Sequence, residues 1–147
     1  MEQPIIPPVS KELLKSELTE DCQLRLTNKS HNRIYIITAH NAPNTMREIG
    51  RLREEAFRAA GGGTGKECDI DEFDTCENCY KQLIVWNPEE EEIIGGYRYL
   101  EGEDWEMDSN GQPILATSHM FHFSQKFLRD YKDQTVELGR SFVTLGY

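Results

Sequence analysis

The sequence LIVWNPEEEEIIGGYRYL, residues 83–100, has the pattern of a β-hairpin. Leu83 to Trp86 and Ile93 to Leu100 are rich in branched aliphatic and aromatic side chains, which favour strands. Asn87 and Pro88, followed by a run of glutamates, favour a turn between them. The segment therefore predicts two adjacent antiparallel strands.

The flanking segments supply more strands and helices. Residues 33–39 and 135–144 are the other predicted strands, because they are β-branched and aromatic. Apolar residues at helical spacing predict helices at 11–20, 45–60 and 124–132. The remaining stretches, 21–32, 61–81 and 101–113, are expected to be connections. This order of elements is typical of an α+β domain with a largely antiparallel sheet.

The predicted helix over residues 45–60 is the strongest of the three. Asn44 is its expected cap, and three consecutive glycines end it. Arg53 lies four residues before Phe57 at the edge of the apolar stripe, which makes Arg53 the candidate functional residue of this helix. Two i, i+4 pairs are assigned to the solvent side, where they support the helix: Arg51 with Glu55, and Glu54 with Arg58.

Three short polar strings lie in or beside the apolar segments: Asp71-Glu72-Phe73-Asp74, Gly95-Gly96-Tyr97-Arg98 and Glu137-Leu138-Gly139-Arg140-Ser141. An unpaired charge at a half-buried position is costly, so these residues either pair with one another or build a site. Alone, the two aspartates are typical of a loop cap or turn. Arginines in three segments that each have one apolar face favour a shared pocket wall instead.

The last string allows two interpretations. Glu137 and Arg140 form a structural ion pair in the first, and a general base beside its orienting cation in the second. Gly139 between them suggests a β-bulge, which re-aims neighbouring side chains and amides. The Gly95-Gly96 pair weakens a strand unless another group must approach its backbone closely.

Composition and charge narrow the class of protein. The 147 residues, 37% of them hydrophobic, are enough to bury the core of one domain, which we place at residues 33–147 after an N-terminal extension with a short helix, residues 1–32. A net charge of -10 argues against nucleic acid as a partner of the whole chain, because phosphate binding needs clustered cations. The N-terminus lacks the layout of a secretory signal, which favours a cytoplasmic location.

Four cysteines raise the question of a metal site. Cys76 and Cys79 have the spacing of zinc ligands, and Cys68 lies close upstream. A closed zinc site needs four ligands, however, and a second Cys-x-x-Cys or a well-placed His-x-x-x-His is missing. We therefore expect reduced thiols and no metal ligands, with a non-catalytic interaction or zinc-binding module as the alternative to an enzyme.

Taken together, the strings resemble the N-terminal half of the GNAT-like N-acyltransferases. More narrowly, they resemble the hemolysin-like proteins that make ornithine or glycine lipids, and they are similar at the same positions to acyl-homoserine-lactone synthases. The likeness extends over residues 33–147 and rests on these strings: Arg51-Leu52-Arg53 with Phe57, Asp71-x-Phe73-Asp74, Leu83-Ile84-Val85-Trp86, Gly95-Gly96-Tyr97-Arg98-Tyr99-Leu100 and Glu137-Leu138-Gly139-Arg140-Ser141-Phe142-Val143. The implied fold is a GNAT-like, mostly antiparallel sheet flanked by helices.

The resemblance implies transfer of a fatty acyl group, commonly 3-hydroxyacyl, to the amine of an amino acid of the glycine or ornithine type, in aminolipid biosynthesis. The donor is acyl carrier protein or acyl-CoA, each presenting its acyl group on phosphopantetheine, with no other cofactor. Glu137 and Arg140 correspond to the catalytic positions. The positions that correspond to substrate binding are Arg53, Phe57, Asp71, Asp74, Arg98, Gly139 and Ser141.

The same family continues beyond a fourth strand with a phosphopantetheine-binding loop and a fifth strand. We therefore expect the chain to be truncated after its fourth predicted strand, with possible loss of activity. The edge of that strand is then expected to pair with a missing C-terminal half or a second chain, since exposed edges invite pairing. Peripheral contact with the inner membrane is a further expectation from the family.

Overall fold

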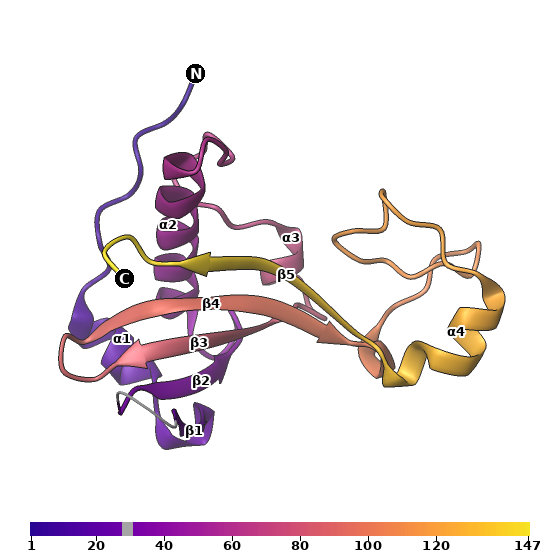
Figure 1. Ribbon diagram of the computed structural model, residues 1–147, viewed down its shortest axis with the longest axis horizontal. Helices are drawn as coiled ribbons and strands as arrows, with labels where there is room; N and C mark the ends of the chain where they lie inside the picture. Colours follow the sequence, from indigo (N-terminus) through magenta and orange to yellow (C-terminus); the bar gives the residue numbers. More distant parts are fainter. Residues whose placement is uncertain (28–30) are drawn as a thin grey trace.

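A computed structural model describes residues 1–27 and 31–147. Its centre is a five-stranded antiparallel sheet in the order β1 to β5, so each strand pairs with the next one along the chain. The strands are β1 (Gln23–Leu26), β2 (Arg33–Ile37), β3 (Lys81–Asn87), β4 (Glu92–Glu101) and β5 (Val136–Val143). The helices are α1 (Lys11–Glu17), α2 (Pro43–Ala59), α3 (Glu72–Thr75) and α4 (Gln125–Tyr131). The α+β class is confirmed (Figure 1).

The predicted hairpin is present as β3 and β4. Its inward positions alternate strictly with half-buried ones along β3, where Gln82, Ile84 and Trp86 are buried. The glycines of β4 stand where other backbone passes close by. A Cβ at Gly96 would lie 2.3 Å from the carbonyl oxygen of Leu83, so no larger residue fits there without movement of the strand.

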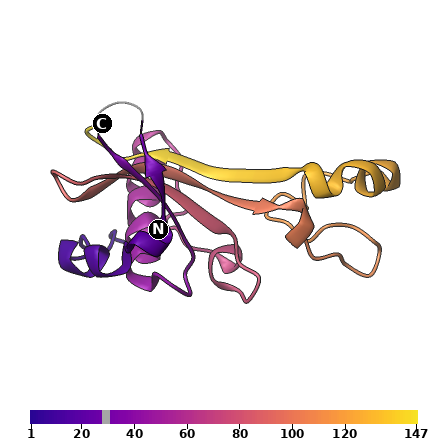
Figure 2. The ribbon, with the colours of Figure 1, turned by 90° about the horizontal axis from the view of Figure 1, so that it is seen from below.

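Helices α1 and α2 contact each other and lie on the same side of the sheet (Figure 2). The main core fills the space between α2 and the inward face of the sheet, and it includes Ile37, Ile49, Leu52 and Ile84. Burial of these side chains is the main stabilising contribution.

The start of α2 differs from the prediction. The helix begins at Pro43, so Asn44 is inside it, and Ala42 at the cap position offers no side-chain hydrogen bond. Glu17, the last residue of α1, caps the helix instead. Its carboxylate accepts hydrogen bonds from the backbone amides of Asn44 and Thr45 at 3.0 and 2.6 Å. A residue 28 positions away therefore caps the helix.

Two segments predicted as connections contain regular structure. Residues 23–26 form β1, whose leucines alternate with polar residues and which pairs with β2; residues 28–30 of that connection lie outside the described part. Residues 72–75 form the short helix α3, which Asp71 caps. Neither segment has enough apolar residues to show a clear period.

Residues 102–135, including α4, project beyond one end of the sheet, away from α2 (Figures 1 and 2). A second, smaller core joins them to the end of the sheet: Trp105 and Leu115 of this segment pack with Tyr80 and Leu100. None of the described helices is both long enough and apolar enough to cross a membrane.

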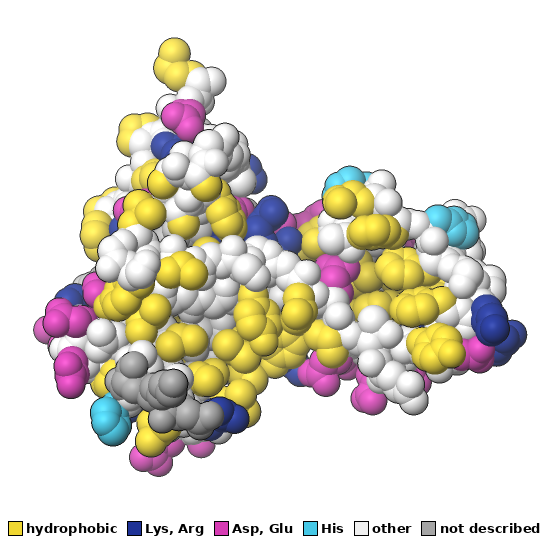
Figure 3. Space-filling view, viewed as in Figure 1, with side chains coloured by type: hydrophobic (Ala, Val, Ile, Leu, Met, Phe, Trp, Pro, Cys, Tyr) yellow, Lys and Arg dark blue, Asp and Glu magenta, His cyan; other side chains and the backbone are white. Residues whose placement is uncertain are grey.

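The face of the sheet opposite α2 carries many exposed apolar side chains (Figure 3). Leu24 and Leu26 are each 55% exposed, and Leu138 on β5 is 57% exposed. A groove on this face is lined by Leu24, Ile36, Leu83, Tyr97, Tyr99, Glu101, Val136 and Leu138. Strand β5 is an edge of the sheet within the described residues.

Candidate functional site

Two arginines are buried with carboxylates on the inward face of the sheet. Arg53 from α2 is fully buried, and its guanidinium donates to Asp74 Oδ2 at 3.1 Å and to Gln82 Oε1 at 2.7 Å. Arg98 from β4 donates to both carboxylate oxygens of Asp71, at 2.7 and 3.1 Å, and lies 3.2 Å from Asp74. The pair of Arg98 and Asp71 is bidentate, the geometry that compensates best for taking charge out of water.

The short helix α3 fixes the two aspartates. Asp71 accepts from the backbone amide of Phe73, and Asp74 accepts from the backbone amide of Asp71, so that each carboxylate caps the same turn. Capping and charge pairing are thus not alternatives here, because both aspartates do both.

The environment shifts the pKa values of this cluster in different directions. Burial lowers the pKa of Arg53, and the neighbouring Asp74 opposes that effect. Burial alone would raise the pKa of Asp71, but the hydrogen bonds and charge of Arg98 outweigh it and lower the pKa below its ordinary value. Asp69, buried behind them, has a raised pKa because burial outweighs its attraction to Arg140 and Arg53.

Arg140 is held more loosely than the other two arginines. Its side chain is 37% exposed, and its guanidinium nitrogens lie 3.5 Å from Asp69 and 3.4 Å from Asp71. Its backbone has a φ of 52°, in the left-handed region. Between the pairs Gly96 with Phe142 and Arg98 with Gly139, β5 has one more residue than β4, so the predicted bulge is present and falls on Arg140 and Ser141.

Glu137 does not pair with Arg140 among the contacts of the described residues, so the structural ion pair is wrong. Its Oε1 accepts from the hydroxyl of Tyr80 at 2.6 Å, and its Oε2 accepts from the hydroxyl of Thr117 at 2.7 Å. The guanidinium of Arg98 lies over the ring of Tyr80, 5.2 Å from its centroid. Tyr80 therefore connects Glu137 to the arginine and aspartate cluster.

Two open pockets flank this row of β5 residues. One, of about 330 Å³, is mostly apolar and has Trp105, Leu115, Phe123 and Glu137 in its wall. The other, of about 500 Å³, is lined by Phe57, Ala60, Gly62, Gly63, Arg140 and Ser141. Every residue predicted for the site therefore lies in the cluster, on β5 or in these pocket walls.

Four residues of this network are missing from the sequence prediction: Asp69, Tyr80, Gln82 and Thr117. Gln82 had a visible signal, since it occupies an inward position of β3 in phase with Ile84 and Trp86. Asp69 repeats the acidic character of Asp71 two residues earlier. Tyr80 and Thr117 carry no such pattern, and only the fold brings them to Glu137.

Both helix pairs were assigned to the wrong side. Glu54 does pair with Arg58, at 2.6 Å, but its side chain is fully buried instead of facing solvent. It accepts from Thr64 and from the amide of Gly65, so it holds the glycine-rich loop against α2. The pair of Arg51 and Glu55 is present at 2.7 Å, but the Arg51 side chain is only 11% exposed and also pairs with Glu48, so its assignment to the solvent side is wrong as well.

The cysteines are free thiols. Cys76 is exposed and Cys79 is buried. Within residues 1–27 and 31–147, no group of three or more His, Cys, Asp and Glu side chains is arranged to hold a metal ion.

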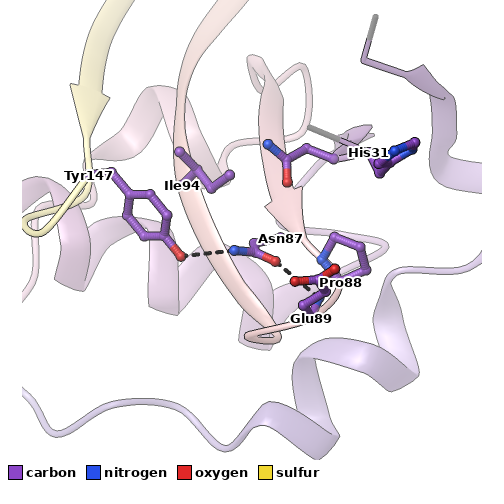
Figure 4. Close-up of a pocket in the computed structure, with 7 residues that line it drawn as sticks. His31, Asn87, Pro88, Glu89, Ile94 and Tyr147 are labelled. Carbon is purple, nitrogen blue, oxygen red and sulfur yellow. Dashed lines mark hydrogen bonds between the residues drawn. The ribbon is translucent and has the colours of Figure 1, made fainter. Parts of the chain in front are cut away.

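A further pocket lies at the opposite end of the hairpin, by the turn between β3 and β4 (Figure 4). Asn87 donates to the hydroxyl of Tyr147 there at 3.3 Å. Glu89 is the only acidic residue among its lining residues, and no arginine of the cluster reaches it.

The chain is similar to proteins of known class. Residues 52–147 match the family described as acetyltransferase (GNAT) domain. A glycine N(alpha)-acyltransferase of Bacteroides thetaiotaomicron is 74% identical over 143 residues, which are 97% of this chain and 42% of that protein. A glycine N(alpha)-acyltransferase of Phocaeicola vulgatus is 68% identical over 143 residues, 97% of this chain and 44% of that protein. The chain thus spans less than half the length of these curated relatives, and no solved structure matches it.

Proposed function

Because the chain belongs to the acetyltransferase (GNAT) domain family, we propose that it is part of an N-acyltransferase that moves a fatty acyl group from a thioester to the amine of glycine. The observation that carries this proposal is the position of Glu137, a half-buried carboxylate at an open pocket beside the arginine and aspartate cluster. The names of the two relatives favour glycine over ornithine as the acceptor.

Acyl transfer to glycine requires a general base beside the amine. The ammonium group of glycine must lose a proton before its nitrogen can attack a thioester carbonyl, and we assign that proton to Glu137, directly or through one water. The C–N bond then forms and the C–S bond breaks. As the tetrahedral intermediate collapses, the nitrogen releases its second surplus proton to the solvent, and the proton on Glu137 passes to the thiolate that leaves. The products are an N-acylglycine, a free thiol and one proton.

The oxyanion of the tetrahedral intermediate needs donors as well. We place it at the bulge of β5, because a bulge releases backbone amides from regular strand pairing. Arginines held by buried carboxylates keep this wall of the site rigid, which favours orientation of the two substrates.

The donor and the pathway rest on the sequence resemblance. We propose that acyl carrier protein or acyl-CoA presents the acyl group on phosphopantetheine, and that the product enters aminolipid synthesis as in the hemolysin-like enzymes. A cytoplasmic protein with peripheral contact to the inner membrane fits that role. The apolar pocket of about 330 Å³ beside Glu137 supports an apolar donor.

The test is acylation of glycine by the protein expressed from the full reading frame, with mass spectrometry of the lipids formed. We expect N-acylglycine, and we expect Glu137→Gln to lower kcat by about 100-fold or more, as for loss of a general base. Glu101→Gln on β4 is the matched control, because Glu101 pairs with Lys81 at the surface. A Glu137→Gln enzyme with full activity and an unchanged pH profile would refute the assignment of the base.

A further inference from the structure

The inward face of the sheet has an open place at Gly139. Gln82, Arg98 and Gly139 stand opposite one another on β3, β4 and β5, so all three face the same way. The first two are buried and fill their positions with polar side chains. At Gly139 no atom of the described chain, its two sequence neighbours aside, lies within 4 Å of the point that a Cβ would occupy. The position next to Arg98 on the inward face, at Gly139, is therefore not filled by any side chain of the described residues.

Opposite charges flank this space along β5. Glu137 precedes Gly139 on the inward face, opposite the buried Leu100, with its carboxylate held by Tyr80 and Thr117. Arg140 follows it, turned by the bulge toward Asp69 and Asp71. A carboxylate and a guanidinium thus lie on either side of a position without a side chain.

Arg140 has binding capacity that the other arginines lack. Arg53 and Arg98 are buried and make hydrogen bonds as short as 2.7 Å to their partners. Arg140 is 37% exposed, against 0% for the side chain of Arg53 and 3% for that of Arg98, and its contacts to the aspartates are longer, at 3.4 and 3.5 Å. A guanidinium with free donors is the group that best recognises a carboxylate.

We propose that the space over Gly139 is the binding site for the acceptor amino acid, with its ammonium toward Glu137 and its carboxylate toward Arg140. This inference rests on the proposed function and adds the place and orientation of the acceptor. The orientation brings the attacking nitrogen to the base. It also matches the two charges of an amino acid with opposite charges on the protein, whereas a simple amine would bring no carboxylate to the exposed part of Arg140.

Gly139→Ala tests the placement. The φ of Gly139 lies outside the left-handed region and its Cβ position is empty, so alanine fits the fold and only fills the site. We expect an unchanged melting temperature and a rise of about tenfold or more in KM for glycine, because the methyl group occupies acceptor space. Val143→Ala is the matched control, since Val143 is on the same strand with its side chain 59% exposed.

Arg140→Gln tests the orientation, with glycine and glycinamide as paired acceptors. Glycinamide keeps the amine but lacks the carboxylate. We expect the variant to lose about ten- to a hundredfold in kcat/KM for glycine, the usual size of a lost charged hydrogen bond, with much less change for glycinamide.

The outcomes of these experiments distinguish a failure of the proposed acceptor site from a failure of the proposed acyltransferase function. If the wild-type protein acylates neither acceptor, the proposed function is wrong. If it acylates glycine and Gly139→Ala has the same KM as Val143→Ala, the acceptor binds elsewhere. An equal loss for both acceptors in Arg140→Gln would overturn the carboxylate contact alone.

Discussion

At the scale of single residues, Tyr80 has a role that follows from its contacts. Its side chain is buried, and its hydroxyl donates to Glu137 while accepting from the amide of Ala116 at 3.0 Å. Burial, and then the hydrogen bond to Glu137, raise the pKa of Tyr80 far above its ordinary value, so the phenol keeps its proton and remains a donor at neutral pH. Tyr80 is therefore a positioning residue for Glu137.

We expect Tyr80→Phe to lower kcat for glycine acylation by about tenfold with little change in KM, and to cost about 1 kcal/mol of unfolding free energy for the lost hydrogen bond. Steady-state kinetics and urea unfolding measure the two effects. Tyr99→Phe is the control, because the hydroxyl of Tyr99 makes no hydrogen bond within the described residues. A proportional rise of KM with an unchanged kcat would contradict the positioning role.

The charged residues show how far single positions can be predicted. Arg53 and Arg98 were predictable because a charge in an apolar segment demands a partner, and Asp71 and Asp74 are the partners. The ion pair of Glu137 and Arg140 was wrong because sequence proximity does not give direction: the bulge turns Arg140 toward Asp71 while Glu137 faces Tyr80. Contacts such as Tyr80 with Glu137 join residues 57 apart, and no local pattern encodes them.

At the scale of elements, the start of α2 depends on Glu17. This carboxylate accepts four hydrogen bonds from Asn44 and Thr45, and it lies at the positive end of the helix dipole. We expect Glu17→Ala to lower the unfolding free energy by about 1–2 kcal/mol, the range for loss of a helix cap. Urea unfolding measures it, with the exposed Glu12→Ala of the same helix as control. Equal stability of the two variants would show that the cap contributes nothing.

The end of α2 is held by Glu54, and this predicts a pH dependence. Burial alone would raise the pKa of Glu54, but the hydrogen bonds from Thr64, Arg58 and the amide of Gly65 lower it from 4.5 to about 2. A carboxylate with a lowered pKa in the folded state stabilises the protein above its unfolded pKa, so this contribution is complete above about pH 4.5 and is lost as the pH falls toward 2.

We therefore expect Glu54→Gln to be less stable than the wild type at pH 7 and to lose less stability than the wild type between pH 4.5 and pH 2.5. Urea unfolding at several pH values measures the slope. The exposed Glu89→Gln is the control and should keep the wild-type slope. A Glu54→Gln protein with that same slope would show that other carboxylates carry the acid sensitivity.

At the scale of the whole molecule, the α+β class and four of the five strands were predictable, because residues 83–100 and the two outer strands have strong strand composition. Strand β1 was missed because a segment of four residues with two leucines is too short to show the alternation of apolar and polar residues that indicates a strand. The position of residues 102–135 beyond the end of the sheet has no local signal either, since it depends on packing of Trp105 and Leu115 against Tyr80. Local composition predicted elements, and long-range packing decided where they meet.

The two faces of the sheet make unequal contributions to stability. Ile37 is fully buried under α2, whereas Leu24 and Leu26 on the opposite face are each 55% exposed. Burial of apolar area is the main stabilising contribution, so we expect Ile37→Ala to cost about 2–5 kcal/mol, and Leu24→Ser or Leu26→Ser less than about 0.5 kcal/mol. Urea unfolding of the three variants measures the difference. A large loss in either leucine variant would mean that the face opposite α2 is covered in solution, and light scattering at several concentrations would then show whether a second copy covers it.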